Sequence, residues 1–409
     1  MRIALKEGIY LPFNKEIMLN LLICIVWAAV LLQYAKGIFN RFPFLQDYND
    51  EASFIFVIIP LLLSLPALIN KFCLADYIFF FISVLYYLAS YIFFPDNAEY
   101  LTDNAFTCIC CVFPFYFLGR IIDINKWYDI FLFLSSACIL MTVFYYFVYA
   151  QGNKNMEEIA GDDNMYAAYR LLPHVAFLLW ATLEKIRIWK AIITLLGIMF
   201  LLSCGTRGPF VCLGFLGIIY FFFFMNFKGA IYVKLGIISL SLMILANLTN
   251  VIYFLVKTFT GLQLSTRILE KIVAGDLGND SYRSVLRDKL YEVLGSGEHF
   301  WGIGYFGSMQ YGIIYSHFLP LDFFCYYGYF MGSILLLLLF SLIGISFWRA
   351  RGTKNQVFIL YLFSISIIKL LLSNTFILEP YFYLLIGVCV HEIFNHRIVA
   401  SQKGPDSIC

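Results

Sequence analysis

Long apolar runs recur along the chain, separated by shorter polar segments. Windows of about nineteen residues, roughly the length a helix needs to cross a bilayer, detect about twelve of them. The runs are 16–36, 52–70, 74–94, 104–119, 129–150, 166–183, 188–203, 209–226, 231–257, 316–347, 355–374 and 377–395. This pattern predicts an all-α fold, a polytopic membrane helical bundle in which residues 1–409 form a single transmembrane domain. The run 316–347 is too long for a straight crossing, so we expect its part before Gly328 to be an interfacial or broken helix.

The composition supports a membrane protein. Hydrophobic residues make up 62% of the chain and charged residues 13%, whereas soluble proteins contain about 45–50% and about 25%. These values exclude a soluble enzyme and a disordered chain. The formal net charge of +2 gives no concentrated basic face, so nucleic acid is not expected as a partner. Most of the eleven cysteines lie in apolar runs, where we expect them to pack as small hydrophobic residues.

Charged residues separate between the two sides of the predicted bundle. With the N-terminus in the cytoplasm, the inside segments collect lysine and arginine, for example Arg120 and Lys190. The short outside loops are instead acidic, for example at Asp96 and Glu157. The positive-inside rule therefore predicts that both termini are cytoplasmic.

One outside connection, residues 258–315, is much longer than the others. Within it, residues 281–294 have the pattern of an amphipathic helix that ends at Gly295. Its leucine stripe predicts that Arg283 and Arg287 face the membrane domain. The alternative is that both arginines reach the lipid headgroups or pair with a surface carboxylate.

Charged residues inside predicted spans are costly and mark functional sites by default. Arg170, Asp322 and Lys369 lie at similar depths in the outer halves of three spans, and Arg207 occupies a tight outside turn. We expect these residues to line a polar chamber that opens outward. A simple ion pair between Asp322 and Lys369 is the alternative, but it leaves Arg170 and Arg207 unexplained.

The predicted chamber suits an amphiphile with a phosphorylated head. Its arginines, Arg207, Arg267, Arg283 and Arg287, stay charged and bind phosphate oxygens in pairs, so a lipid-linked pyrophosphate is the expected ligand. His317 begins the tenth span, where it is a candidate general base or a donor to the diphosphate. The alternative for His317 is an ordinary interfacial side chain.

Four short motifs in residues 160–335 resemble, in order, those of the O-antigen polymerase and O-antigen ligase superfamily. They are Thr206-Arg207-Gly208, the loop arginines Arg267 and Arg283, the glycine pair Gly302 and Gly304, and Ser316-His317 before a membrane helix. Two positions depart from the family pattern. Thr206 stands where the family has serine, and Phe318 stands where the family has asparagine.

The resemblance implies a GT-C-type, metal-independent inverting glycosyltransferase without a cofactor. It would move an oligosaccharide from undecaprenyl pyrophosphate to an acceptor sugar at the outer face of the bacterial cytoplasmic membrane. The resemblance implies that Arg207, Arg283 and His317 are catalytic and that Arg267, Gly302 and Gly304 take part in substrate binding. The charge pattern described above adds four expected substrate-binding residues, Arg170, Arg287, Asp322 and Lys369. Besides the lipid-linked oligosaccharide and membrane lipids, a chain-length regulator and a flippase are the partners implied.

Three other functions remain open from the sequence. A polymerase extends a lipid-linked repeat, whereas a ligase transfers the finished glycan to lipid A core. We favour the polymerase because the histidine motif matches loosely and the chain is rich in aromatic residues, with 44 Phe and 29 Tyr. A transporter or flippase would usually show two similar halves, and we find no internal repeat. A structural or sensor protein would not need the outer arginines.

Overall fold

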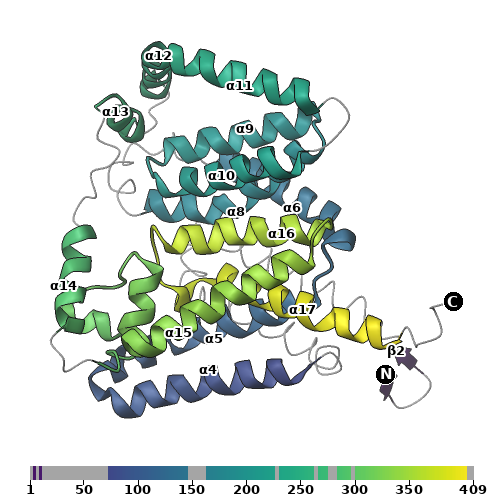
Figure 1. The fold of residues 1–409 in the computed structure, drawn as a ribbon. Coiled ribbons are helices and arrows are strands. Elements are labelled where there is room, and N and C mark those ends of the chain that lie inside the picture. The colour runs from purple at the N-terminus through teal and green to yellow at the C-terminus, as the bar shows by residue number, and fades with distance from the viewer. Residues whose placement is uncertain are drawn as a thin grey trace. The chain divides into compact units, whose positions relative to one another are not determined.

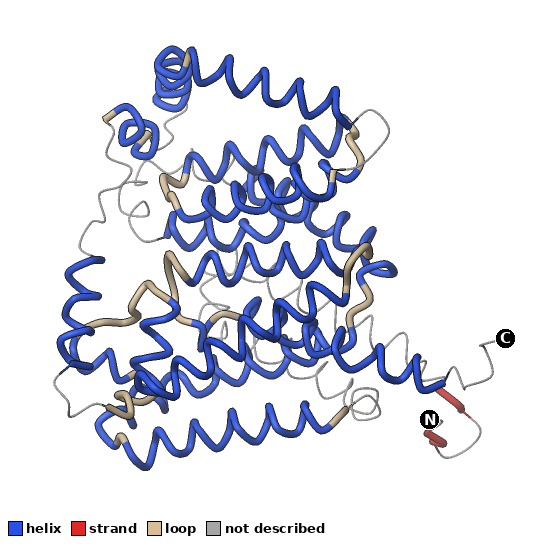
Figure 2. The backbone as a smooth tube through the Cα atoms, in the orientation of Figure 1, coloured by secondary structure: helices blue, strands red, loops and turns tan. Residues whose placement is uncertain are grey.

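The computed structural model describes residues 3–5, 9–11, 72–145, 163–225, 230–261, 266–274, 283–295 and 300–402. Nearly all of these residues are helical, as Figure 2 shows, and the predicted helical fold class is confirmed for them. A short antiparallel hairpin of β1 (Ile3–Leu5) and β2 (Ile9–Leu11) is the exception. The first two predicted spans, 16–36 and 52–70, lie outside the described residues.

Each of the remaining apolar runs contains helix (Figure 1). They are α4 (Leu74–Phe93), α5 (Ala98–Ile121), α6 (Ile124–Tyr145), α8 (Asp163–Glu184), α9 (Ile188–Ser203), α10 (Gly208–Ile219), α11 (Ala230–Ala246), α12 (Leu248–Gly261), α15 (Leu319–Arg349), α16 (Lys354–Phe363) and α17 (Pro380–Gln402). Two π-helical segments, η3 (Tyr220–Phe224) and η5 (Ser364–Ile368), continue α10 and α16. The long loop contains α13 (Arg267–Val273), α14 (Arg283–Gly295) and the 3-10 turn η4 (Gly307–Tyr311).

Three described helices are long and apolar enough to cross a membrane: α4, α6 over Ile124–Phe144, and α15. A fourth span is possible if Pro95–Ala105 and Thr107–Ile121, bent by 61°, count as one. Other apolar helices, such as α9, are shorter. The chain therefore carries helices compatible with a membrane protein, while about twelve spans and the location of the termini stay predictions.

The prediction of one helix over 231–257 is wrong. The run is divided into α11 and α12 at Asn247, whose side-chain amide donates to the Met243 carbonyl at 3.0 Å. An asparagine that bonds a nearby carbonyl competes with the helical hydrogen bonds and favours a break. The predicted break in 316–347 is confirmed, because Gly328 has non-helical angles (φ 76°, ψ 169°) inside α15.

The chain divides into two compact units, a finer division than the single domain expected from the sequence. Unit 1 comprises Met1–Ile124, Val285–Leu362 and Ser373–Cys409, and unit 2 comprises Asn125–Ser284 and Phe363–Leu372. In unit 1, α5 and α17 are close neighbours. A Cβ atom added at Gly119 or Gly387 would overlap the backbone of the other helix, so these glycines permit the close packing.

In unit 2, α8 packs against α9 and α10. The core of α8 is aromatic: Phe177 and Trp180 are buried and their ring centroids are 5.1 Å apart. The Ser364 hydroxyl on η5 donates to the Cys212 carbonyl of α10 at 2.6 Å. This bond fixes η5 against α10, and both segments carry residues of the candidate site.

Candidate functional site

Three cationic residues of unit 2, Arg170, Arg207 and Lys369, lie on segments that adjoin Tyr169 on α8, and a fourth, Arg283, is bonded to the segment that carries Lys369. The Nζ atom of Lys369 lies 5.3 Å from the centroid of the Tyr169 ring, within the range of a cation–π interaction. A Cβ atom added at Gly208 would overlap the Tyr169 hydroxyl, so the backbone next to Arg207 also touches this tyrosine. We call Arg170, Arg207, Arg283 and Lys369 the cationic cluster.

Arg207 lies in the turn 204–208 between α9 and α10. Gly205 has φ 68° and donates its N–H to the Leu202 carbonyl at 3.1 Å, which lets the chain reverse. Arg207 is the N-cap of α10, and its carbonyl accepts the Phe210 N–H at 3.1 Å. The guanidinium therefore comes from the positive end of a helix, where anions are stabilised.

Thr206 in this turn carries a hydroxyl, as would a serine at the same position. Its Oγ1 atom is buried and has no hydrogen-bond partner among the described residues. Buried hydroxyls are normally paired. The Thr206 hydroxyl is therefore a further candidate for binding a ligand beside Arg207.

Arg283 is the first residue of α14, and its Nη1 donates to the Leu372 carbonyl at 2.8 Å. The Leu372 N–H in turn donates to the Lys369 carbonyl at 2.9 Å. These two bonds place Arg283 one turn beyond Lys369. Arg170 follows Tyr169 on α8, and all four cations of the cluster are partly exposed, so solvent and a ligand can reach them.

Arg267 begins α13, and its side chain lies outside the described part of the structure. The helix α13 is held by apolar packing, because Leu269 lies in a cluster with Leu202 and Phe210. Those two residues flank the turn that carries Arg207. The start of α13 is thereby held near the cationic cluster, although sequence patterns did not predict this helix.

The amphipathic helix predicted for the loop is confirmed as α14. Leu290 and Leu294 are buried, whereas Asp288 and Glu292 are exposed. Arg287, on the part of α14 that belongs to unit 1, lies with its Cζ 6.0 Å from the centroid of the Phe318 ring. Arg287 thus lies over the aromatic residue that directly follows His317.

His317 adopts a backbone conformation that is rare for a bulky residue, with φ 56°. Its neighbours hold the turn: the Ser316 hydroxyl accepts the Phe318 N–H at 3.0 Å and donates to the Phe318 carbonyl at 2.9 Å. Asp322 accepts the Ser316 N–H at 3.3 Å. The Tyr315 and His317 rings lie 4.4 Å apart.

Gly302 and Gly304 have a packing role in unit 1. Their φ angles are 87° and 71°, which favour glycine. A Cβ atom would lie 2.6 Å from the Cys325 carbonyl oxygen at Gly302 and 2.5 Å from the Phe94 ring at Gly304. Gly302 therefore lets the loop lie against the broken helix α15, and Gly304 lets it lie against Phe94 at the end of α4. Their part in substrate binding stays a prediction.

The predicted residues are therefore distributed over both units. Unit 2 contains Arg170, Arg207, Arg283 and Lys369, and unit 1 contains Arg287, Gly302, Gly304, His317 and Asp322. Asp322 and Lys369 fall in different units, so their ion pair stays a prediction. The described residues contain no group of three or more histidine, cysteine or acidic side chains suited to a metal ion.

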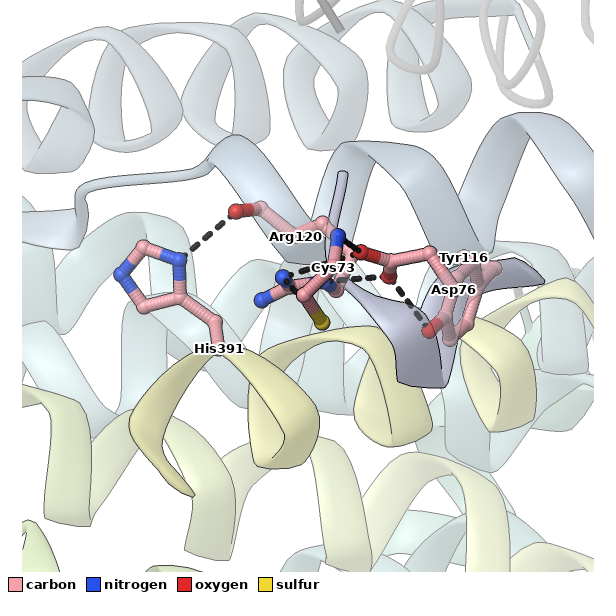
Figure 3. Close-up of polar contacts among 5 residues, drawn as sticks. All are labelled: Cys73, Asp76, Tyr116, Arg120 and His391. Atoms are coloured by element: carbon pink, nitrogen blue, oxygen red, sulfur yellow. Dashed lines mark hydrogen bonds and ion pairs between the residues drawn. The ribbon is translucent and has the colours of Figure 1, made fainter. Parts of the chain in front are cut away.

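A buried ion pair in unit 1 was missed by sequence patterns (Figure 3). Arg120 on α5 donates from Nε to Asp76 Oδ1 at 2.6 Å and from Nη2 to Oδ2 at 3.1 Å. The hydroxyl of Tyr116 donates to Oδ1 at 2.7 Å, and the backbone N–H of Cys73 donates to Oδ2 at the same distance. The pair joins α4 to α5, and the only sequence signal for it is that Asp76 lies at the start of an apolar run.

The sequence matches no family profile, no characterised protein and no solved structure.

Proposed function

We propose that the cationic cluster binds the diphosphate of a lipid-linked oligosaccharide and that the protein is a polysaccharide polymerase. The observation that supports this best is the position of Arg207. Arg207 lies at the N-terminus of α10, next to Gly208, whose backbone lies close to the Tyr169 hydroxyl. The ammonium group of Lys369 lies over the ring of the same tyrosine.

The charge and shape of the cluster suit a diphosphate. Three guanidinium groups and one ammonium group carry four formal positive charges, and the end of α10 adds a partial positive charge of about 0.5. Guanidinium groups bind pairs of phosphate oxygens, whereas lysine acts as a point charge. The Thr206 hydroxyl supplies a neutral donor to the same ligand.

The surroundings of the cluster suit a lipid anchor. The helices that lead to the turn 204–208 expose apolar side chains, including Leu195 on α9 and Val211 on α10. An isoprenoid chain is stabilised along such surfaces by the hydrophobic effect. A free nucleotide sugar would gain nothing from them.

In the proposed reaction, a hydroxyl oxygen of the acceptor attacks the anomeric carbon of the donor sugar. A new carbon–oxygen bond forms while the bond to the diphosphate oxygen breaks, with inversion at the carbon. The cationic cluster stabilises the negative charge that grows on the leaving diphosphate. For unit 1, we assign to His317 the proton that leaves the acceptor hydroxyl, because imidazole is the side chain that most often serves as a general base.

A strain that lacks this gene, complemented with variants, tests the proposal. Arg283→Gln and Arg207→Gln should abolish long polymer and leave single-repeat product, because each removes a guanidinium from the diphosphate site. Arg349→Gln is the matched control, since Arg349 also donates to a backbone carbonyl, that of Ile393 at 2.7 Å, but lies outside the cluster.

Gel analysis of the polysaccharide reads out the result, with membrane protein levels measured in parallel. Polymer of normal length with both cluster variants would reject the diphosphate assignment. Full-length polymer stranded on the carrier lipid in the deletion strain would instead identify the ligase reaction.

A further inference from the structure

The backbone of His317 is strained and must be held by its surroundings. A φ of 56° for a residue with a large side chain occurs when neighbouring contacts enforce it, and such positions cluster at functional sites. Glycine would adopt this angle more readily, but it would lack the imidazole. We therefore infer that the imidazole of His317 is needed here, although its side chain disfavours the positive φ angle of the backbone.

Hydrogen bonds on both sides of His317 enforce that conformation. The Ser316 hydroxyl binds both the N–H and the carbonyl of Phe318, at 3.0 Å and 2.9 Å. The Ser316 N–H is held by Asp322 Oδ1 at 3.3 Å. Asp322 is itself anchored in the first turn of α15, where its N–H donates to the Phe318 carbonyl at 3.1 Å.

Asp322 is a destabilising residue for a purely structural contact, because its carboxylate is buried. Its side chain is only 2% exposed, and its partners are the backbone and hydroxyl of Ser316 and the hydroxyl of Thr375. Burying a carboxylate away from water costs stability even when it accepts hydrogen bonds from neutral groups. Its presence is explained if fixing the neighbouring turn matters more than local stability.

We propose that Asp322 is a positioning residue that holds His317 through the backbone of Ser316. This inference depends on the proposed function, in which His317 accepts the proton of the acceptor hydroxyl. Asp322 does not touch the substrate and does not bind the diphosphate, which a carboxylate would repel. It fixes the imidazole in the orientation that proton transfer requires.

The test compares Asp322→Leu with Asp322→Asn in the purified full-length protein. Leucine removes the acceptor of the Ser316 N–H, so kcat of the transfer should fall about 100-fold, the range of a misplaced general base, with an unchanged KM for the lipid-linked donor. Asparagine keeps an oxygen for that N–H and should restore kcat to within about tenfold of wild type. Equal losses for the two variants would overturn the proposal.

Glu379→Gln is the matched control, because this carboxylate of unit 1 is equally buried, at 1% exposure, but its hydrogen bond at 3.1 Å comes from Asn374 and not from the turn that carries His317. It should leave kcat within a few-fold of wild type. Ser316→Ala is a milder second variant that weakens the same turn from its other side. Ser316→Ala should lower kcat and leave the donor KM unchanged, and it can be measured even if Asp322→Leu does not accumulate in membranes. An unchanged kcat for Ser316→Ala would count against the proposal.

A double variant separates positioning from general damage. If Asp322 acts through His317, adding Asp322→Leu to His317→Ala should cause almost no further loss. A further loss as large as that of Asp322→Leu alone would contradict the inference.

Amide hydrogen exchange gives a readout that needs no activity. The Ser316 amide should exchange faster in Asp322→Leu and at the wild-type rate in Asp322→Asn. If the wild-type protein shows no transferase activity, the proposed function fails, while the exchange result still decides whether Asp322 holds the turn. Unchanged exchange in Asp322→Leu would reject the positioning role.

Discussion

Loss of Arg120 should destabilise unit 1 strongly. The Asp76 carboxylate, only 1% exposed, accepts hydrogen bonds from Arg120, Tyr116 and the backbone of Cys73. Arg120→Met removes both guanidinium bonds and leaves the charge buried among apolar helices. Hydrogen bonds to charged groups are worth about 1.5–3 kcal/mol each, and breaking a buried ion pair costs about 3–5 kcal/mol. We therefore expect the free energy of unfolding to fall by about 4 kcal/mol.

Urea unfolding in detergent micelles, followed by tryptophan fluorescence, measures this loss. The double variant Asp76→Asn with Arg120→Met removes the uncompensated charge but keeps an acceptor for Tyr116 and Cys73. It should regain at least about 2 kcal/mol relative to Arg120→Met alone. As a control, Arg349→Met should cost less than about 1 kcal/mol, because its guanidinium is exposed. A loss below about 1 kcal/mol for Arg120→Met, or a double variant as unstable as the single one, would refute the reasoning.

Two further outcomes follow from the turn between α9 and α10. Burial raises the pKa of the Cys204 thiol to about 12, so the thiol stays protonated at pH 8. A maleimide reagent should therefore label Cys204 only after denaturation. Rapid labelling of Cys204 in the native protein would contradict this burial. Gly208→Ala should reduce polymer formation because its Cβ overlaps the Tyr169 hydroxyl, and Tyr169→Phe in the same chain should recover part of the activity; full activity of Gly208→Ala alone would disprove the close approach.

Much of the helical layout was predictable because apolar runs mark helices directly. The run 188–203 corresponds to α9, and the amphipathic pattern at 281–294 locates α14 to within two residues. The length of 316–347 also predicted the break at Gly328. The division at Asn247 was not predicted, because α11 is apolar on all sides and the amphipathic α12 continues the same apolar run without a glycine or proline between them.

The candidate site was predictable in its residues but not in its arrangement. The turn that carries Arg207 stands out because charge, glycine and proline interrupt two apolar runs. By contrast, the bond from Arg283 to the Leu372 carbonyl joins residues 89 positions apart, and a single sequence contains no information on such a pairing. The same reason explains why the pair of Asp76 and Arg120 and the packing contacts of Gly302 and Gly304 were not predicted.

The most direct test of the cationic cluster is binding of a short prenyl diphosphate to the purified protein, with the matching prenyl alcohol as control. Wild-type protein and Arg349→Gln should bind the diphosphate and not the alcohol. Arg207→Gln should bind it at least about tenfold more weakly, because a charged hydrogen bond is worth about 1.5–3 kcal/mol. Equal affinity of wild type and Arg207→Gln for the diphosphate would contradict the account.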